Sequence, residues 1–172
     1  MKTIILTVVS PDRPGLVKML SDVIVKHEGS WGQSSMANMA GQFAGILLVS
    51  VDEPNLPALN KDLQALSKQD MMVTISESGT VVEADLQIVW LEITGHDQPG
   101  IVHEVASACS DLGANLISLE TDVVSGSMSG EAMFIASAEL QLPAQLDPED
   151  VREALEQLSD DLMVDLAVAD KL

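Results

Sequence analysis

Aromatic residues are nearly absent: the 172 residues include two tryptophans, two phenylalanines and no tyrosine. The core must therefore be aliphatic, and few side chains could stack on a base or a sugar ring. A single cysteine, Cys109, excludes an internal disulfide and a thiolate metal cluster within one chain. Cys109 falls on the apolar stripe of an expected helix, which favours a buried, inert thiol over a nucleophile.

Basic residues are also scarce, with 8 Lys and Arg against 27 Asp and Glu and a net charge of −19. Such a surface repels phosphate backbones and anionic membranes, so we expect no direct contact with nucleic acid and no membrane binding. The excess of acidic residues either keeps the protein soluble or forms a docking face for a basic partner. The apolar run at residues 4–9 is too short for a signal peptide or a membrane span, so we expect a cytoplasmic protein.

The strongest pattern is an internal repeat. The segment DRPGLV at residues 12–17 recurs 85 residues later as DQPGIV at 97–102. Each copy follows an apolar run that predicts a strand, and each precedes apolar residues whose spacing predicts one face of a helix. Both helices are expected to end near a glycine, Gly29 and Gly113, as a left-handed cap would require.

The rest of each half repeats too. Two strands are expected at 115–124 and 131–140, joined by a turn-rich loop at 125–130, and the matching hairpin of the first half turns near 40–41. A second helix and a closing strand, at 71–75 and 162–168, complete each half. This order predicts an α+β protein of two ferredoxin-like βαββαβ units, with antiparallel sheets and helices on one face. The expected domains are 1–80 and 85–172, with a linker at about 77–84.

The signature Asp-x-Pro-Gly-[Leu/Ile]-Val in a βαββαβ unit resembles the ACT domain family, twice. Two such units without an enzyme domain resemble the glycine cleavage system transcriptional repressor family. The resemblance implies binding of an amino acid at interfaces between ACT units. The residues that would line such sites are the two loops, the two helix starts and one position on the following strand: Asp97, Gln98, Pro99, Gly100, Ile101, Val102 and Asn115 in the second repeat, and Asp12, Arg13, Pro14, Gly15, Leu16 and Trp31 in the first.

These residue types have a physical rationale. A proline tolerates a helix start, and a glycine allows close approach of the backbone. The first-turn N–H groups near Gly100 could donate to a ligand carboxylate, and Asn115 offers both a donor and an acceptor. Aligned on the two glycines, Trp31 stands where the second repeat has Asn115, so we expect a closed or reshaped first site. The alternative is that Asp12 and Asp97 merely cap helices.

Three functions remain open. The favoured one is an oligomeric regulatory protein that binds an amino acid and alters its contact with a partner protein, following the repressor family in acting without direct DNA contact. A ligand-free structural adaptor is the second. An acylphosphatase-like enzyme is the third, weakened because Arg13 is the one arginine of the loop and Pro14 lacks an N–H. We expect no catalytic residues and no cofactor; His96 and His103 make at most a weak metal site.

Overall fold

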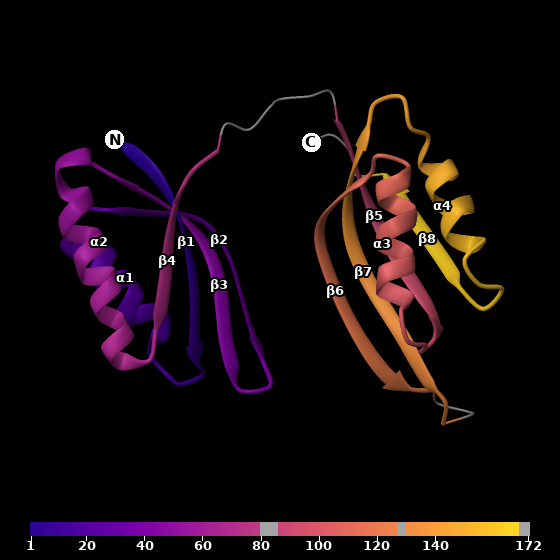
Figure 1. Cartoon of the computed structure of the whole chain (residues 1–172), viewed down its shortest axis with the longest axis horizontal. Coiled ribbons are helices and arrows are strands. Elements are labelled where there is room, and N and C mark those ends of the chain that lie inside the picture. Colours follow the sequence, from indigo (N-terminus) through magenta and orange to yellow (C-terminus); the bar gives the residue numbers. More distant parts are fainter. Residues whose placement is uncertain (80–85, 127–129, 169–172) are drawn as a thin grey trace. The chain divides into compact units, whose positions relative to one another are not determined.

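The computed structural model describes residues 1–79, 86–126 and 130–168. The chain divides into two compact units, Met1–Val81 and Val82–Leu172. Each unit runs strand, helix, strand, strand, helix, strand and has one four-stranded antiparallel sheet with its α-helices on one face (Figure 1). This confirms the predicted α+β class. Residues 80 and 85, most of the expected linker and residues 127–129 of the expected loop lie outside the described residues.

The first unit has the sheet order β2-β3-β1-β4. Two short 3-10 turns, η1 (Glu53–Asn55) and η2 (Leu66–Gln69), flank its second helix. Its regular elements are β1 (Lys2–Pro11), α1 (Leu16–Lys26), β2 (Ser30–Met39), β3 (Gln42–Val51), α2 (Leu56–Ala65) and β4 (Met72–Glu77).

The second unit has the matching order β6-β7-β5-β8. Within the described residues, no helix of either unit is long and apolar enough to cross a membrane. The elements of this unit are β5 (Leu86–His96), α3 (Ile101–Asp111), β6 (Asn115–Ser125), β7 (Ala132–Pro143), α4 (Pro148–Glu156) and β8 (Met163–Val168).

Each unit buries an aliphatic core between its helices and one face of its sheet. Successive strand side chains point to opposite faces, so every second residue of β1 and β5 is buried. Cys109 belongs to the second core and is 1% exposed, which confirms the predicted burial of this thiol. Burial raises the pKa of Cys109, because the apolar surroundings disfavour the thiolate.

Strand pairing corrects the sequence alignment of β2 with β6. Trp31 pairs with Val49, and Leu116 pairs with Leu140. These two partners lie opposite equivalent residues of the central strands β1 and β5. Trp31 is therefore the counterpart of Leu116, and like Leu116 it packs against the core of its own unit.

The true counterpart of Asn115 is Ser30, which pairs with Ser50 as Asn115 pairs with Gln141. The 85-residue offset thus continues through β6, and the expectation that Trp31 replaces Asn115 is wrong. The error of one residue arose because the two repeats were aligned on Gly29 and Gly113, which are not equivalent positions.

The left-handed residue after α1 is Glu28, with φ of 56°, whereas after α3 it is Gly113, with φ of 77°. The expected left-handed cap at Gly29 is therefore wrong by one residue. A Cβ on Gly29 would lie 2.9 Å from Cγ2 of Ile24, so this glycine is required for a close approach to the helix instead.

Candidate functional site

The turn between β5 and α3 positions the Asp-x-Pro-Gly segment of the second unit. Gly100 precedes the first residue of α3 and has φ of 94°; Gly15 precedes α1 with φ of 93°. Neither helix has a side-chain cap hydrogen bond at this end. The alternative that Asp12 and Asp97 cap the helices is therefore wrong, and Pro14 and Pro99 lie in the turns, before the helices begin.

Positive φ explains the two glycines. A Cβ at Gly15 or Gly100 would meet no atom within 4 Å. The expected reason, a close approach of the backbone, therefore does not apply within the unit. L-residues seldom adopt this left-handed conformation, whereas glycine does so without steric cost. The open space in front of Gly100 leaves the end of α3 accessible.

Two N–H groups at this end of α3 have no acceptor within the helix. The N–H of Glu104 donates to the carbonyl of Gly100 at 3.0 Å, and that of Ile101 reaches the carbonyl of Gln98 at 3.4 Å. The N–H groups of Val102 and His103 precede the first intrahelical bond. Together with the helix dipole they form a partial positive charge that favours a carboxylate.

The predicted loop residues are brought together, but their side chains differ in environment. Leu16 and Ile101 are 3% and 5% exposed, so they anchor the helices in the core rather than face solvent. The N–H of Asp97 donates to the carbonyl of Ala132 at 2.9 Å, which ties the loop to β7. In the first unit the N–H of Asp12 makes the matching bond to Gly41, also at 2.9 Å.

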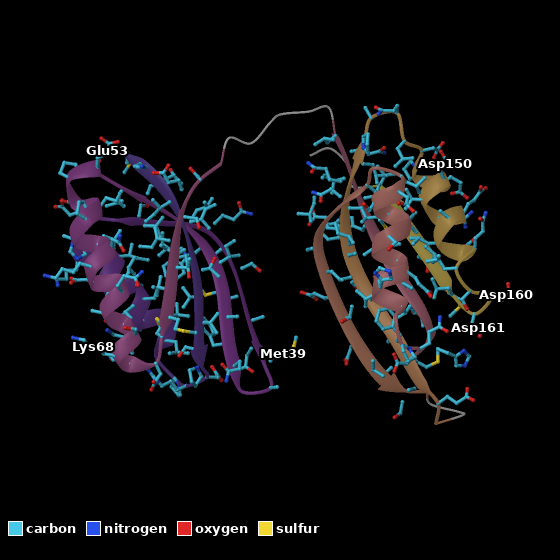
Figure 2. The ribbon with its side chains drawn as sticks, in the orientation of Figure 1. Met39, Glu53, Lys68, Asp150, Asp160 and Asp161 are labelled. Carbon is cyan, nitrogen blue, oxygen red and sulfur yellow. The ribbon has the colours of Figure 1, made fainter. Side chains whose placement is uncertain are left out.

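His96 was expected only as part of a weak metal site, and it immediately precedes Asp97 in the sequence. Its imidazole Nε2 lies 3.1 Å from a carboxylate oxygen of Glu131, and its Nδ1 lies 3.5 Å from a carboxylate oxygen of Asp161. Figure 2 labels Asp161 near the end of the second unit at which β5 leads into α3. The strand ends thus gather an imidazole and two carboxylates beside the helix terminus.

The first unit has a different environment at the matching turn. The guanidinium of Arg13 donates to the backbone carbonyl of Gln69, so it is held by its own unit. The first turn of α1 has no acidic residue, whereas that of α3 has Glu104. The strand position of His96 is taken by Pro11, whose side chain is apolar. The two turns share a backbone and differ in charge.

Asn115 lies at the opposite end of its sheet from the turn. It pairs with Gln141, which pairs in turn with Ile88, near the start of β5. The turn follows His96, eight positions further along β5, and this length of strand spans about 27 Å. Within one unit the structure therefore does not bring Asn115 to the Asp-x-Pro-Gly turn.

A family model described as ACT domain matches residues 2–76, and another of the same description matches residues 89–160. The chain belongs to the ACT domain family. Each of its two units is thus an ACT domain, as the repeated signature predicted. Membership supports a ligand-binding, regulatory role.

Two solved structures match both ACT domains in tandem. An unknown protein from Galdieria sulphuraria is 24% identical, with 98% of each chain covered and a TM-score of 0.81. A "putative glycine cleavage system transcriptional repressor" is 15% identical, again with 98% of each chain covered, and has a TM-score of 0.70. At these identities the similarity shows the fold. No curated protein sequence matches the chain.

The turn of the second ACT domain combines groups of both signs. The helix terminus offers N–H donors to an anion, while Glu131 and Asp161, both paired with His96, and the exposed Asp97 add negative charge at the strand ends. These charges complement an α-amino acid zwitterion, whose carboxylate and ammonium groups are attached to one carbon. Within the described part of the chain, no group of three or more His, Cys, Asp or Glu side chains could hold a metal ion.

Proposed function

We propose that the protein is a cytoplasmic regulator that binds a small amino acid at its second ACT domain and changes its contact with a partner protein. The observation that carries this proposal is that the first-turn N–H donors of α3 lie beside the carboxylates around His96. A zwitterionic ligand complements both signs of charge, whereas a simple anion would be repelled by the carboxylates.

In this proposal the ligand carboxylate accepts hydrogen bonds from the N–H groups of Val102 and His103. Its ammonium group lies toward Asp97, Glu131 or Asp161. Gln98 and Pro99 shape the turn, and Gly100 leaves the helix terminus open.

Asn115 enters this proposal from a second copy of the chain. Because it lies about 27 Å from the turn of its own domain, it can reach a ligand only at another ACT domain. Two second domains placed side by side in opposite directions would bring the turn of each to the start of β6 of the other. The amide of Asn115 would then supply a donor and an acceptor to the ligand. This arrangement requires a homo-oligomer when the ligand is bound.

The second domain is the better binder in this proposal, although Trp31 is not the reason. Ser30, the counterpart of Asn115, offers one hydroxyl in place of an amide. Arg13 also places a positive charge at the first turn, where an ammonium group would be repelled. The residues of the first turn, Asp12 to Leu16, are therefore expected to bind the ligand weakly or not at all.

The partner in this proposal is a protein. A net charge of −19 opposes the counterion release that drives binding to DNA. If the chain acts as the repressor family does, the partner is a transcription activator, and control of transcription proceeds without direct DNA contact.

A thermal-shift series with the twenty amino acids at millimolar concentration tests the proposal. A ligand that binds only the folded state stabilises it by about 2.7 kcal/mol at a hundredfold excess over its Kd. For a protein of this size we expect a rise in melting temperature of about 5–10 °C.

Two matched variants test which ACT domain is responsible for the rise in melting temperature. Asn115→Ala removes an exposed amide and should abolish most of the rise without lowering the melting temperature of the free protein. Ser30→Ala, at the equivalent position of the first domain, should leave the rise intact. If no amino acid raises the melting temperature, the ligand-free adaptor becomes the better account.

A further inference from the structure

The open face of the first sheet has an unusual composition. In each unit the helices cover one face of the sheet (Figure 1). Alternate strand residues point away from that face. On the first sheet these outward residues are apolar side chains or small hydroxyls. We call this surface the neutral face; its central residues are Ile5, Thr7, Ile46, Leu48, Met72 and Thr74.

The neutral face carries no charged side chain. Strands β1 to β4 contain two charged residues, Lys2 and Glu77. Both occupy positions that alternate with the outward residues, and they pair with each other at 2.5 Å. In a chain with 27 acidic residues and a net charge of −19, a whole sheet face without charge is not a consequence of composition.

The second sheet shows that the fold does not require this neutrality. At the positions of Thr7, Leu48 and Thr74, which the strand registers make equivalent, it carries three carboxylates: Glu92, Glu139 and Asp165. Glu92 and Asp165 stand directly opposite each other on neighbouring strands. Like charges in such positions are destabilising, yet the fold carries them. The same face is thus acidic in one unit and neutral in the other.

The neutral face also exposes apolar side chains. Ile46 is 50% exposed and Met72 is 65% exposed. Between β3 and the irregular part of β2 the face is hollowed, and Ile5, Ile46 and Leu48 are among the residues that line the hollow. Exposed apolar side chains on a hollowed surface without charge are typical of a protein interface.

We propose that the neutral face is the surface through which two copies of the chain pair, each presenting the same face to the other. Two chains of charge −19 repel each other, so a contact between copies is favoured where neither contributes charge. A twofold axis through the face places each neutral face on its own counterpart, so both sides are uncharged. The acidic face of the second sheet would pack poorly on the neutral face, because Glu92, Glu139 and Asp165 would be buried without counter-ions.

The size of the face suits a weak dimer. Four strands spaced about 4.8 Å apart and paired over roughly eight residues give a flat sheet area of roughly 500 Å². This area does not include the additional surface of the protruding side chains. Specific interfaces bury about 800 Å² per partner. We therefore expect a dimer that dissociates on dilution, and one that tightens as salt screens the repulsion between the two copies.

Analytical ultracentrifugation of the ligand-free protein tests this proposal. The parent should sediment at twice the chain mass of 18.3 kDa at high concentration. A variant with Thr7→Glu, Leu48→Glu and Thr74→Asp should sediment at the single-chain mass, with an unchanged circular dichroism spectrum. These are the residues that the second unit itself carries, so the fold should accept them. Ile46→Ser, which takes the residue of the second unit at that position, is a milder variant and should raise the dissociation constant at least tenfold.

The matched control is Glu92→Thr, the reciprocal change on the second sheet, which should leave the dissociation constant of the dimer unchanged. Three results would overturn the proposal. The first is a parent that stays at the single-chain mass at every concentration. The second is a dimer that survives the triple substitution. The third is a dimer that weakens as salt is added, which would indicate attraction between opposite charges.

Discussion

Substitutions at Gly100 and Gly15 separate two effects of changing the Asp-x-Pro-Gly turn. One is conformational strain in the backbone, and the other is loss of ligand binding. The φ angles of the two glycines are 94° and 93°, and an added Cβ would meet nothing within 4 Å at either position. Substitution by alanine therefore introduces the same conformational strain in both turns and no clash. An L-residue in the left-handed region costs about 1–2 kcal/mol.

Urea unfolding of Gly15→Ala and Gly100→Ala should show this loss to the same extent. For a protein of this size each 1 kcal/mol lowers the melting temperature by about 2–4 °C. The ligand response should differ, because a methyl group at Gly100 projects into the open space in front of the donors of α3. We expect the amino-acid-dependent rise in melting temperature to be lost in Gly100→Ala and kept in Gly15→Ala.

Two results would refute this reasoning. If Gly100→Ala retained the full rise, the ligand would not bind in front of α3. If the two variants differed by more than about 1 kcal/mol in the absence of ligand, the two turns would not be equivalent in the way their φ angles indicate.

Three further predictions concern charge and burial. Hydrogen bonds from Lys26 and then His27 lower the pKa of Asp62, so its contribution to stability should be lost as the pH falls below about 4, and Asp62→Asn should flatten the pH dependence of urea unfolding there. Cys109, 1% exposed, should react with a thiol reagent in urea and not in the native protein. In a gel-shift experiment at physiological salt, the protein should not retard duplex DNA, and salt-sensitive submicromolar binding would contradict this.

The repeat was sufficient to predict the topology, because the 85-residue offset carries both the turn signature and the helical spacing. The repeat did not predict the end of α1 correctly, because the left-handed residue after this helix is not a glycine. Glu28 takes the left-handed position that Gly113 fills in the second unit, since a non-glycine residue can adopt this conformation at a modest cost. Anchoring the alignment on glycine therefore moved Trp31 onto Asn115.

The separation of Asn115 from the turn could have been derived from the sequence. In a strand-helix-strand unit the chain returns along the helix, so the turn before α3 and the start of β6 lie at opposite ends of the sheet. The pairing of His96 with Glu131 and Asp161 could not have been derived in this way. It depends on which side chains meet where β5, β7 and β8 come together, and these residues are far apart in the sequence.

The most direct test of the central claim is a two-dimensional NMR titration of the ¹⁵N-labelled protein with the amino acid that gives the largest thermal shift. The account predicts saturable shifts in the backbone amides of Val102 and His103 and in the side-chain amide of Asn115. The amides of Val17 and Lys18, at the matching turn of the first domain, should move little. Shifts confined to the first turn, or none at millimolar ligand, would contradict it.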